Sequence, residues 1–246
     1  GVDNVDLDAA TRHGVQVCNV PDYGTFEVAD HALSLMLELI RKVGKANAEV
    51  RAGIWDYARY IPVRRISTLT VGIIGVGRIG SAFAKRVHAL GCKVIAYDIN
   101  YDHAKHDHEL GFVELCDSLD DVLSRADVIS LHCGLNADNQ HFMNKANFAK
   151  MKQGSFFINV SRGGLVNEPD LAEAVASGHL TAAGIDVTCT EPLVADSPLR
   201  KVENIIITPH MAWYAVEAAS DLKTKCAEEA VRGALGQAPR CPVNKL

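Results

Sequence analysis

Three polar residues, far apart along the chain, carry side chains that could together bind a small acid and exchange a proton with it. Arg162, Glu191 and His210 each lie just past a short apolar run, where the strands of an open parallel sheet end and ligands bind. An arginine offers a fork of donors to a planar keto acid, and a histidine can exchange a proton with the substrate oxygen. A nearby glutamate would orient the imidazole and favour its charged form. Taken singly, these residues could be a surface cation, a loop charge and a turn residue, so the prediction rests on their joint placement.

The segment from Gly75 to Gly80, of sequence GVGRIG, predicts a dinucleotide-binding turn between a strand and a helix. Its first glycine permits the tight turn, Gly77 lets the backbone approach the pyrophosphate, and the last glycine allows close packing of helix on strand. The N-terminus of the helix, with Arg78 and Ile79, would then face the phosphates. The alternative is a glycine-rich turn with a structural role only.

Two carboxylates at predicted strand ends extend this site. Asp98 lies 18 residues after Gly80, close to the spacing expected for a residue that bonds the adenosine ribose. Ile99 and Asn100 follow it, so no arginine is at hand for a 2′-phosphate, and we predict NAD rather than NADP as the cofactor. Asp186 could bond the nicotinamide carboxamide. Alternatively, the first carboxylate could be a solvated strand end and the second a helix cap.

A doubly wound sheet would position these residues. Six short runs rich in valine and isoleucine are apolar on both faces, the pattern of parallel strands covered by helices on both sides. The predicted strands are Val71–Gly75, Lys93–Tyr97, Asp127–His132, Ser155–Val160, Ala182–Val187 and Asn204–Thr208. Their alternation with helices predicts an α/β fold with right-handed crossovers.

Helices are expected between these strands and on both sides of the sheet. Caps and stops mark the internal ones, through glycines at their ends and through Ser118 and Asn167 at two starts. The predicted helices are Gly80–Leu90, Leu119–Ser124 and Glu168–Ser177, with longer ones at about Phe26–Arg51 and Ala215–Leu235. The first long helix is apolar nearly all round its middle, so we expect it to be buried between domains or subunits.

Composition argues against several kinds of partner and site. A formal net charge of −5, with scattered basic residues, gives no field that would attract nucleic acid or an anionic membrane. No apolar run approaches the ~20 residues needed to cross a bilayer. The seven cysteines are odd in number and form no CxxC pair, which favours reduced thiols in a cytoplasmic protein over disulfides or a metal site.

Taken together, the motifs resemble those of the D-isomer-specific 2-hydroxyacid dehydrogenases, and the resemblance covers essentially the whole chain. The segments that carry it are Gly75–Gly80, Asp98, Ser161-Arg162-Gly163-Gly164, Gly184-Ile185-Asp186, Glu191-Pro192 and Pro209-His210. It implies an NAD-dependent enzyme that moves a hydride to or from a small D-2-hydroxy acid, as a glyoxylate or hydroxypyruvate reductase does. Arg162 would bind the substrate, Glu191 and His210 would form the acid/base pair, and cofactor contacts would come from Cys133, Val160 and Asp186.

The resemblance also implies a domain arrangement. A Rossmann-like cofactor domain is expected at residues 25–213, inserted in a flavodoxin-like substrate domain that the chain holds only in part, at residues 1–24 and 214–246. Gly1-Val2-Asp3-Asn4-Val5-Asp6 matches the segment that closes the family's N-terminal half-domain, so we expect residues to be missing before it. The family usually forms homodimers through the cofactor domain, and Phe26–Arg51 would contribute.

Within the family, three segments look closest to the branch of the C-terminal-binding proteins. They are Leu131-His132-Cys133-Gly134-Leu135-Asn136, Pro209-His210-Met211-Ala212-Trp213-Tyr214 and Pro242-Val243-Asn244-Lys245. Trp213 could therefore shape the substrate pocket, or could be an interdomain packing residue. The alternative function is an NAD-sensing transcriptional corepressor, and the intact Arg162, Glu191 and His210 do not separate it from the enzyme.

Overall fold

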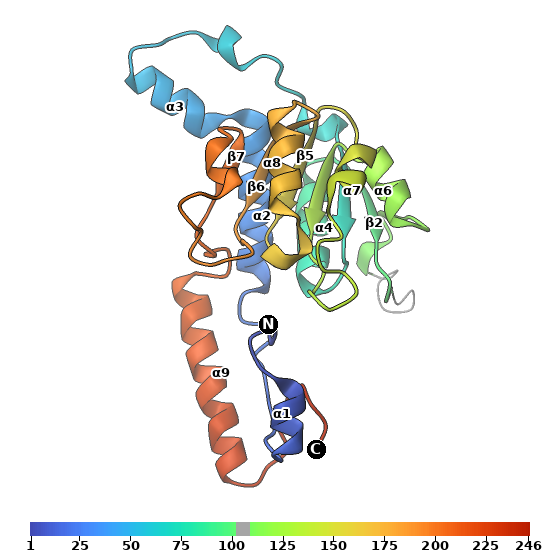
Figure 1. Ribbon diagram of the computed structural model, residues 1–246, viewed down its shortest axis with the longest axis vertical. Helices are drawn as coiled ribbons and strands as arrows, with labels where there is room; N and C mark the ends of the chain where they lie inside the picture. Colours follow the sequence, from blue (N-terminus) through green and yellow to red (C-terminus); the bar gives the residue numbers. More distant parts are fainter. Residues whose placement is uncertain (102–108) are drawn as a thin grey trace.

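A seven-stranded parallel sheet forms the body of the protein, as described for residues 1–101 and 109–246 of the computed structural model (Figure 1). The strands are β1 (Thr70–Ile74), β2 (Lys93–Tyr97), β3 (Val113–Leu115), β4 (Val128–Leu131), β5 (Ser155–Asn159), β6 (Leu180–Ile185) and β7 (Ile205–Ile207). Their order is β3-β2-β1-β4-β5-β6-β7, so the chain turns back between β1 and β4. The predicted doubly wound α/β fold is confirmed, and this reversal opens a crevice at the carboxyl ends of the strands.

Burial explains why the strands could be predicted. Every residue of β4 and β5 is buried, as expected for central strands covered on both faces. β3 was missed because it has only three residues, and all of them keep some exposure at the edge of the sheet. All six predicted strands are present, with ends that differ by at most two residues.

Helices cover both faces of the sheet. On one face α2 (Thr25–Arg41) and α4 (Arg78–Ala89) pack together, α2 over β5 and β6 and α4 over β1 and β2. On the other face lie α6 (Leu119–Arg125), α7 (Lys145–Lys150) and α8 (Glu168–Ala176). The predicted caps are present, since Ser118 accepts a hydrogen bond from the backbone of Asp121 and Asn167 accepts one from Asp170.

The predicted single helix from Phe26 to Arg51 is wrong, because the chain breaks at Lys42. This residue has a φ of +55°, and α3 (Val43–Arg51) starts in a new direction after it. The side chain of Glu38 accepts a hydrogen bond from the backbone of Gly44 and fixes the break. Buried residues occur all along α2 but nowhere in α3, so only α2 belongs to the core.

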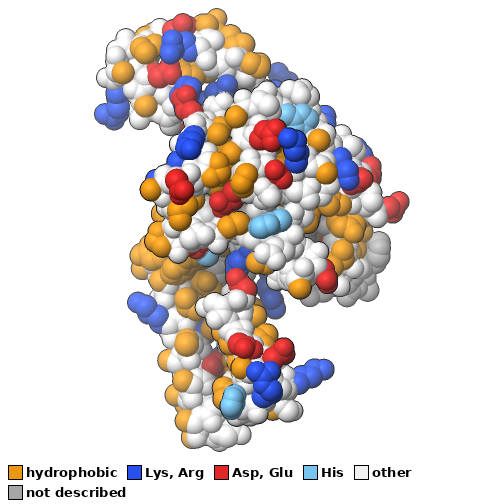
Figure 2. Space-filling view, viewed as in Figure 1, with side chains coloured by type: hydrophobic (Ala, Val, Ile, Leu, Met, Phe, Trp, Pro, Cys, Tyr) orange, Lys and Arg blue, Asp and Glu red, His pale blue; other side chains and the backbone are white. Residues whose placement is uncertain are grey.

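Beyond the break, residues 43–61 form an arm that projects from the body (Figure 1). It contains α3 and the short helix η1 (Tyr57–Tyr60), and Glu49 joins them by accepting hydrogen bonds from Arg59 and Tyr60. At the base of the arm, Arg64 binds the buried carboxylate of Asp127. In Figure 2 the arm, at the top, presents hydrophobic side chains beside charged ones.

The two ends of the chain form a separate lobe beside α9 (Val216–Ala234) (Figure 1). This lobe contains α1 (Leu7–Arg12), and Cys18 pairs with Pro242 in an antiparallel bridge. The side chain of Asn244 accepts hydrogen bonds from Val17 and Gln16 and donates to residues 11 and 15. Among the described residues, three further short helices are η2 (Ile66–Thr68), η3 (Gly163–Leu165) and η4 (Pro198–Lys201). Over residues 1–101 and 109–246, no helix combines the length and the apolar character needed to cross a membrane.

Candidate active site

Two adjoining clefts lie at the carboxyl ends of the strands. The first follows the ends of β1 and β2, and the second lies between the ends of β5–β7 and residues 1–25. Arg78, His132 and Cys133 line both clefts, so the clefts are continuous. Figure 2 shows the surface hollowed between the body and the lobe of the chain ends.

The glycine segment forms the wall of the first cleft, and its geometry requires glycine. Gly75 has a φ of +92°, and a Cβ there would lie 2.7 Å from the backbone nitrogen of Cys133. A Cβ on Gly80 would meet the carbonyl oxygen of Gly75 at 2.0 Å, so that glycine lets helix and strand touch. By contrast, Gly77 has open space where a Cβ would point, directly before the first turn of α4. The N–H groups of that turn are therefore open to an anion such as a pyrophosphate.

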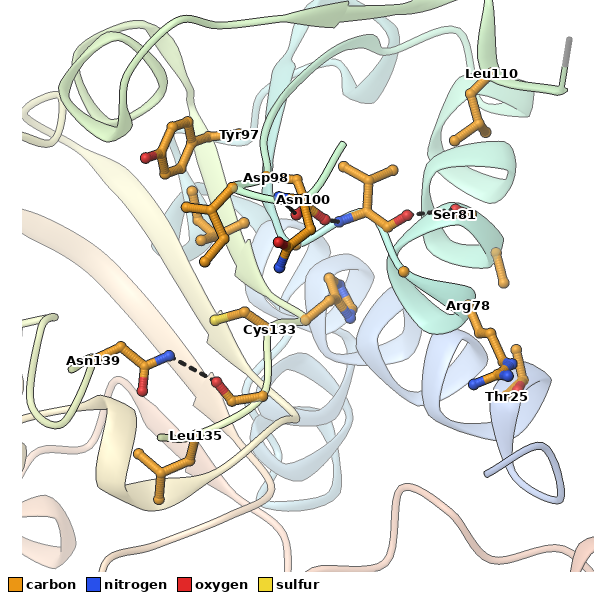
Figure 3. A pocket seen from close by; sticks show the side chains of 18 of the residues that line it. Thr25, Arg78, Ser81, Tyr97, Asp98, Asn100, Leu110, Cys133, Leu135 and Asn139 are labelled. Carbon is orange, nitrogen blue, oxygen red and sulfur yellow. Dashed lines mark hydrogen bonds between the residues drawn. The ribbon is translucent and has the colours of Figure 1, made fainter. Parts of the chain in front are cut away.

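Asp98 fastens this turn from the end of β2 (Figure 3). Its carboxylate accepts a hydrogen bond from the backbone of Val76 at 2.6 Å and another from Asn100 at 2.8 Å. Ser81 donates to the carbonyl of Val76, as the dashed line beside it shows. The sequence predicted a ribose-binding carboxylate here, and the structure adds that the same group holds the glycine turn. Its contact with the ribose stays a prediction.

The remaining predicted cofactor contacts lie at the start of α4 and just past the ends of β4 and β5. Figure 3 shows Arg78 pointing from the start of α4 toward Thr25 of α2. Burial raises the pKa of the Cys133 thiol to about 11, so that side chain stays neutral beside the site. Ile79 and Val160 line the second cleft only.

The predicted acid/base pair is brought together by the loops after β6 and β7. Nδ1 of His210 lies 2.6 Å from Oε2 of Glu191, although 19 residues separate them, and both side chains line the second cleft. His210 has a φ of +50°, an unusual conformation for a residue other than glycine. Since Glu191 engages Nδ1, Nε2 is the nitrogen left to exchange a proton with a ligand.

Arg162 faces the same cleft from the end of β5. Its Nε donates to both carboxylate oxygens of Asp3, at 3.0 and 3.2 Å, and its Nη1 donates to the carbonyl of Ser161. Burial raises the pKa of Asp3, but its hydrogen bonds from the backbone and from Arg162 outweigh burial and hold the pKa below its usual value. The loop is held by Asn159, whose side chain bonds both Ser161 and Arg162. The guanidinium therefore already binds one carboxylate, which is the group that a keto acid presents.

Asp186 is more embedded than the sequence suggested. Its side chain is 1% exposed, and its Oδ1 accepts hydrogen bonds from the hydroxyl of Thr208 and the backbone of Met211. Its Oδ2 accepts one from the backbone of Ala212. Asp186 lines the second cleft, and a bond to a nicotinamide stays a prediction. What the structure adds is that this carboxylate holds the turn on which His210 lies.

Sequence reasoning missed His132 as a site residue. Its Nε2 lies 2.9 Å from the hydroxyl of Ser130, its ring packs on Phe83, and burial lowers its pKa to about 3. Its Nδ1 is buried and has no hydrogen-bond partner among the described residues. A neutral imidazole thus lies between the two clefts. The signal available in the sequence was the polar Ser130 and His132 at the end of an otherwise apolar strand.

Trp213 has features of both predicted roles. It lines the second cleft, and its ring makes edge contacts with Tyr23 and Tyr214 at 5.9 and 5.5 Å between centroids. A Cβ on Gly24 would lie 3.4 Å from its Cβ, so the tryptophan also packs where the first segment enters α2. Within residues 1–101 and 109–246, no three histidine, cysteine or acidic side chains gather as a metal site.

The chain is similar to several known proteins in sequence and in fold. The family model described as the NAD-binding domain of D-isomer-specific 2-hydroxyacid dehydrogenases matches residues 33–212. A hydroxypyruvate reductase of Blautia hydrogenotrophica is 40% identical over 245 residues, which are 95% of this chain and 74% of that protein. A D-3-phosphoglycerate dehydrogenase of Mycobacterium leprae is 44% identical over 228 residues, but the match spans 93% of this chain and only 42% of that protein.

Solved structures give the same result. The TT0316 protein of Thermus thermophilus is 34% identical, with a TM-score of 0.89 over 99% of this chain and 76% of that one. A D-lactate dehydrogenase with NAD+ from Lactobacillus jensenii is 31% identical, with a TM-score of 0.85 over 100% of this chain and 76% of that one.

Proposed function

Because this chain belongs to the family of D-isomer-specific 2-hydroxyacid dehydrogenases, whose cofactor is NAD, we propose that it reduces small 2-keto acids such as glyoxylate or hydroxypyruvate. One observation carries the proposal: Arg162 and the hydrogen-bonded pair of Glu191 and His210 line one cleft, and that cleft continues into the one formed by the glycine turn. The open N-terminus of α4 fits a pyrophosphate, so the residues present suit a dinucleotide.

The proposed roles follow from the geometry. A bound nicotinamide supplies the hydride in one direction and receives it in the other. Arg162 binds the substrate carboxylate and holds the reacting carbon in place. Nε2 of His210 gives a proton to the carbonyl oxygen during reduction and takes it back during oxidation. Glu191 holds Nδ1 and thereby fixes which ring nitrogen faces the substrate.

We extend the proposal to the ends of the chain. Residues 1–24 and 214–246 belong to the substrate domain and residues 25–213 to the cofactor domain. The bonds between Asn244 and residues 11–17 support this division, because they join the two ends to each other rather than to the sheet. Asp3 and Trp213 then mark the boundary at which the second cleft lies.

We also propose a cytoplasmic homodimer built through the arm. Trp55, Tyr57 and Ile61 are 89%, 82% and 62% exposed, and large hydrophobic residues as open as these are typical of interfaces. The cytoplasm is favoured by the odd number of cysteines. The corepressor alternative finds no support in the relatives from Blautia hydrogenotrophica, Mycobacterium leprae and Lactobacillus jensenii, which are called reductases or dehydrogenases.

A panel of 2-keto acids tests the proposed function. Glyoxylate, hydroxypyruvate, pyruvate and phosphohydroxypyruvate are each mixed with the protein and NADH, and oxidation of NADH is followed by absorbance. Turnover of at least one keto acid, with a clear preference for NADH over NADPH, is expected. Absence of turnover from the protein in its natural full length, although it binds NADH, would overturn the proposal.

A further inference from the structure

His31 of α2 reaches the loop that carries the proposed acid/base histidine. Its Nε2 lies 2.9 Å from the hydroxyl oxygen of Thr208 and 3.6 Å from Oδ1 of Asp186. The imidazole is 18% exposed and the carboxylate 1%, so this contact is largely shielded from water. No role assigned above uses His31, and 177 residues separate it from Thr208.

The packing of α2 on β6 explains why this histidine meets this aspartate. Gly184 lets the helix approach, since a Cβ there would lie 3.1 Å from Cβ of Leu35. His31 precedes Leu35 by four residues, or ~6 Å of helix, and Asp186 follows Gly184 by two residues, or ~6.6 Å of strand. The helix and the strand run in opposite directions, so these two steps bring His31 over Asp186. The glycine and the spacing together set the contact.

The three groups form a chain of hydrogen bonds with one consistent direction. Asp186 can only accept when ionised, so the hydroxyl of Thr208, 2.6 Å from its Oδ1, must donate to it. A hydroxyl has one hydrogen, so toward His31 the oxygen of Thr208 acts as the acceptor. Nε2 of His31 must then carry the proton and donate. The direction is therefore from His31 to Thr208 to Asp186.

This series of hydrogen bonds ends on the turn that holds His210. Asp186 accepts hydrogen bonds from the backbone of Met211 and Ala212, and its own carbonyl accepts one from the backbone of His210. His210 has a φ of +50°, so its backbone keeps an unfavourable conformation only while these bonds hold it. Without the donor from Thr208, Oδ1 of Asp186 loses one of its hydrogen-bond partners. The carboxylate then holds the turn of His210 less tightly.

We propose that His31 is a positioning residue, which acts through Thr208 and Asp186 to hold His210 in its proton-transfer geometry. It touches neither substrate nor cofactor in this proposal. The turnover test rests on the proposed reduction of a keto acid, whereas a test of the hydrogen-bond direction does not. A helix that packs on the sheet would in this way set the orientation of the acid/base group.

Kinetics of matched variants test the proposal with hydroxypyruvate and NADH. His31→Leu and Thr208→Val each remove one link and should lower kcat by about tenfold or more, with the Kd for NADH changed less than twofold. The double variant should be no slower than the slower single one, because both changes break one chain. His31→Gln and Thr208→Ser keep a donor and a hydroxyl and should recover most of the turnover. Ser34→Ala, on the exposed side of the same helix, serves as the control and should match the unmodified protein.

Two outcomes of the kinetics would overturn the proposal. One is an unchanged kcat in His31→Leu with the fold intact by circular dichroism. The other is losses in the two single variants that multiply in the double variant, because they would act independently.

Nitrogen NMR of the histidine rings provides a readout independent of turnover. The unmodified protein should show His31 as the tautomer with the proton on Nε2. A proton on Nδ1 alone would make Nε2 an acceptor, break the direction of the chain and overturn the proposal. If the protein reduces no keto acid, the proposed function fails, and the tautomer still decides whether the chain from His31 to Asp186 exists.

Discussion

The guanidinium of Arg162 is held by Asp3, whose two carboxylate oxygens lie 3.0 and 3.2 Å from Nε. A second bond, from Nη1 to the carbonyl of Ser161, fixes the plane of the group. The guanidinium that we propose as the substrate-binding group is thus already oriented, and its orientation depends on two segments 159 residues apart.

Arg162→Lys should therefore lose almost as much activity as a variant without the side chain of Arg162. A lysine carries one compact charge and cannot bond Asp3, Ser161 and a substrate carboxylate together. We expect kcat/KM for hydroxypyruvate to fall about 100-fold, which corresponds to about 2.7 kcal/mol of transition-state stabilisation. Steady-state kinetics give the ratio, and fluorescence titration with NADH should show an affinity within twofold of the unmodified protein. A kcat/KM close to normal would show that the fork of donors is not used.

His210→Ala should abolish most of the chemistry without harming cofactor binding. Loss of a general acid typically costs 100- to 10,000-fold, so we expect kcat to fall about 1,000-fold. Glu191→Gln keeps a hydrogen-bonding group near Nδ1 but removes its charge, and should have a smaller effect, about tenfold to 100-fold. The comparison is made at saturating NADH. Reduction at a near-normal rate by His210→Ala would remove the acid/base assignment.

Asp98→Ala should narrow the preference for NADH over NADPH. The carboxylate repels a 2′-phosphate, and it also holds the turn through the backbone of Val76. We expect the Kd for NADH to rise about tenfold and the Kd for NADPH to change less. Asp98→Asn is the matched control, because it keeps an acceptor for the turn but loses the charge. If both variants prefer NADH over NADPH as strongly as the unmodified protein does, residues other than Asp98 distinguish the two cofactors.

Asp127→Asn should destabilise the body of the protein near neutral pH. This residue is 4% exposed and accepts hydrogen bonds from Lys152, Arg64 and the backbone of Thr70. Burial raises its pKa, but these three donors outweigh burial and hold the pKa below its usual value. The free energy of unfolding should fall by about 2 kcal/mol.

The pH dependence of that loss has a definite sign. A carboxyl group with a lowered pKa in the folded state stabilises the fold above its unfolded pKa, about 3.9, and this contribution disappears as pH falls through the folded pKa. The difference between the unmodified protein and Asp127→Asn should therefore be full at about pH 7 and shrink below about pH 4. Urea unfolding across this range measures it, and a difference that grows toward acid would contradict the assigned cause.

Trp55→Ala combined with Tyr57→Ala should shift the proposed dimer toward monomers. Both side chains lie on the arm, away from the two clefts, so the fold of the body should be kept. Light scattering at several protein concentrations gives the mass. Trp213→Phe, inside the second cleft, is the control and should leave the mass unchanged. An unmodified protein that stays monomeric would remove the proposed dimer.

Periodicity and motif spacing predicted the strands and the residues at their carboxyl ends, because burial on both faces and glycine geometry are local properties. The residues that position these site residues could not be predicted from local sequence patterns. His31 meets Asp186 only because Gly184 lets α2 approach, and no local pattern marks that contact. The break at Lys42 was missed for a similar reason, since the sequence on both sides of it favours a helix and the hydrogen bond from Gly44 to Glu38 decides the outcome.

Asn244 holds the two ends of the chain together, and the ribosome adds it after every strand of the sheet. The whole sheet, from Thr70 to Ile207, leaves the ribosome before this residue does. The cofactor-binding body can therefore fold while the first 24 residues still lack their partner, because Val17 and Gln16 find their acceptor only when Asn244 emerges. The second cleft lies between the first 25 residues and the ends of β5–β7, so we expect it to form after the sheet.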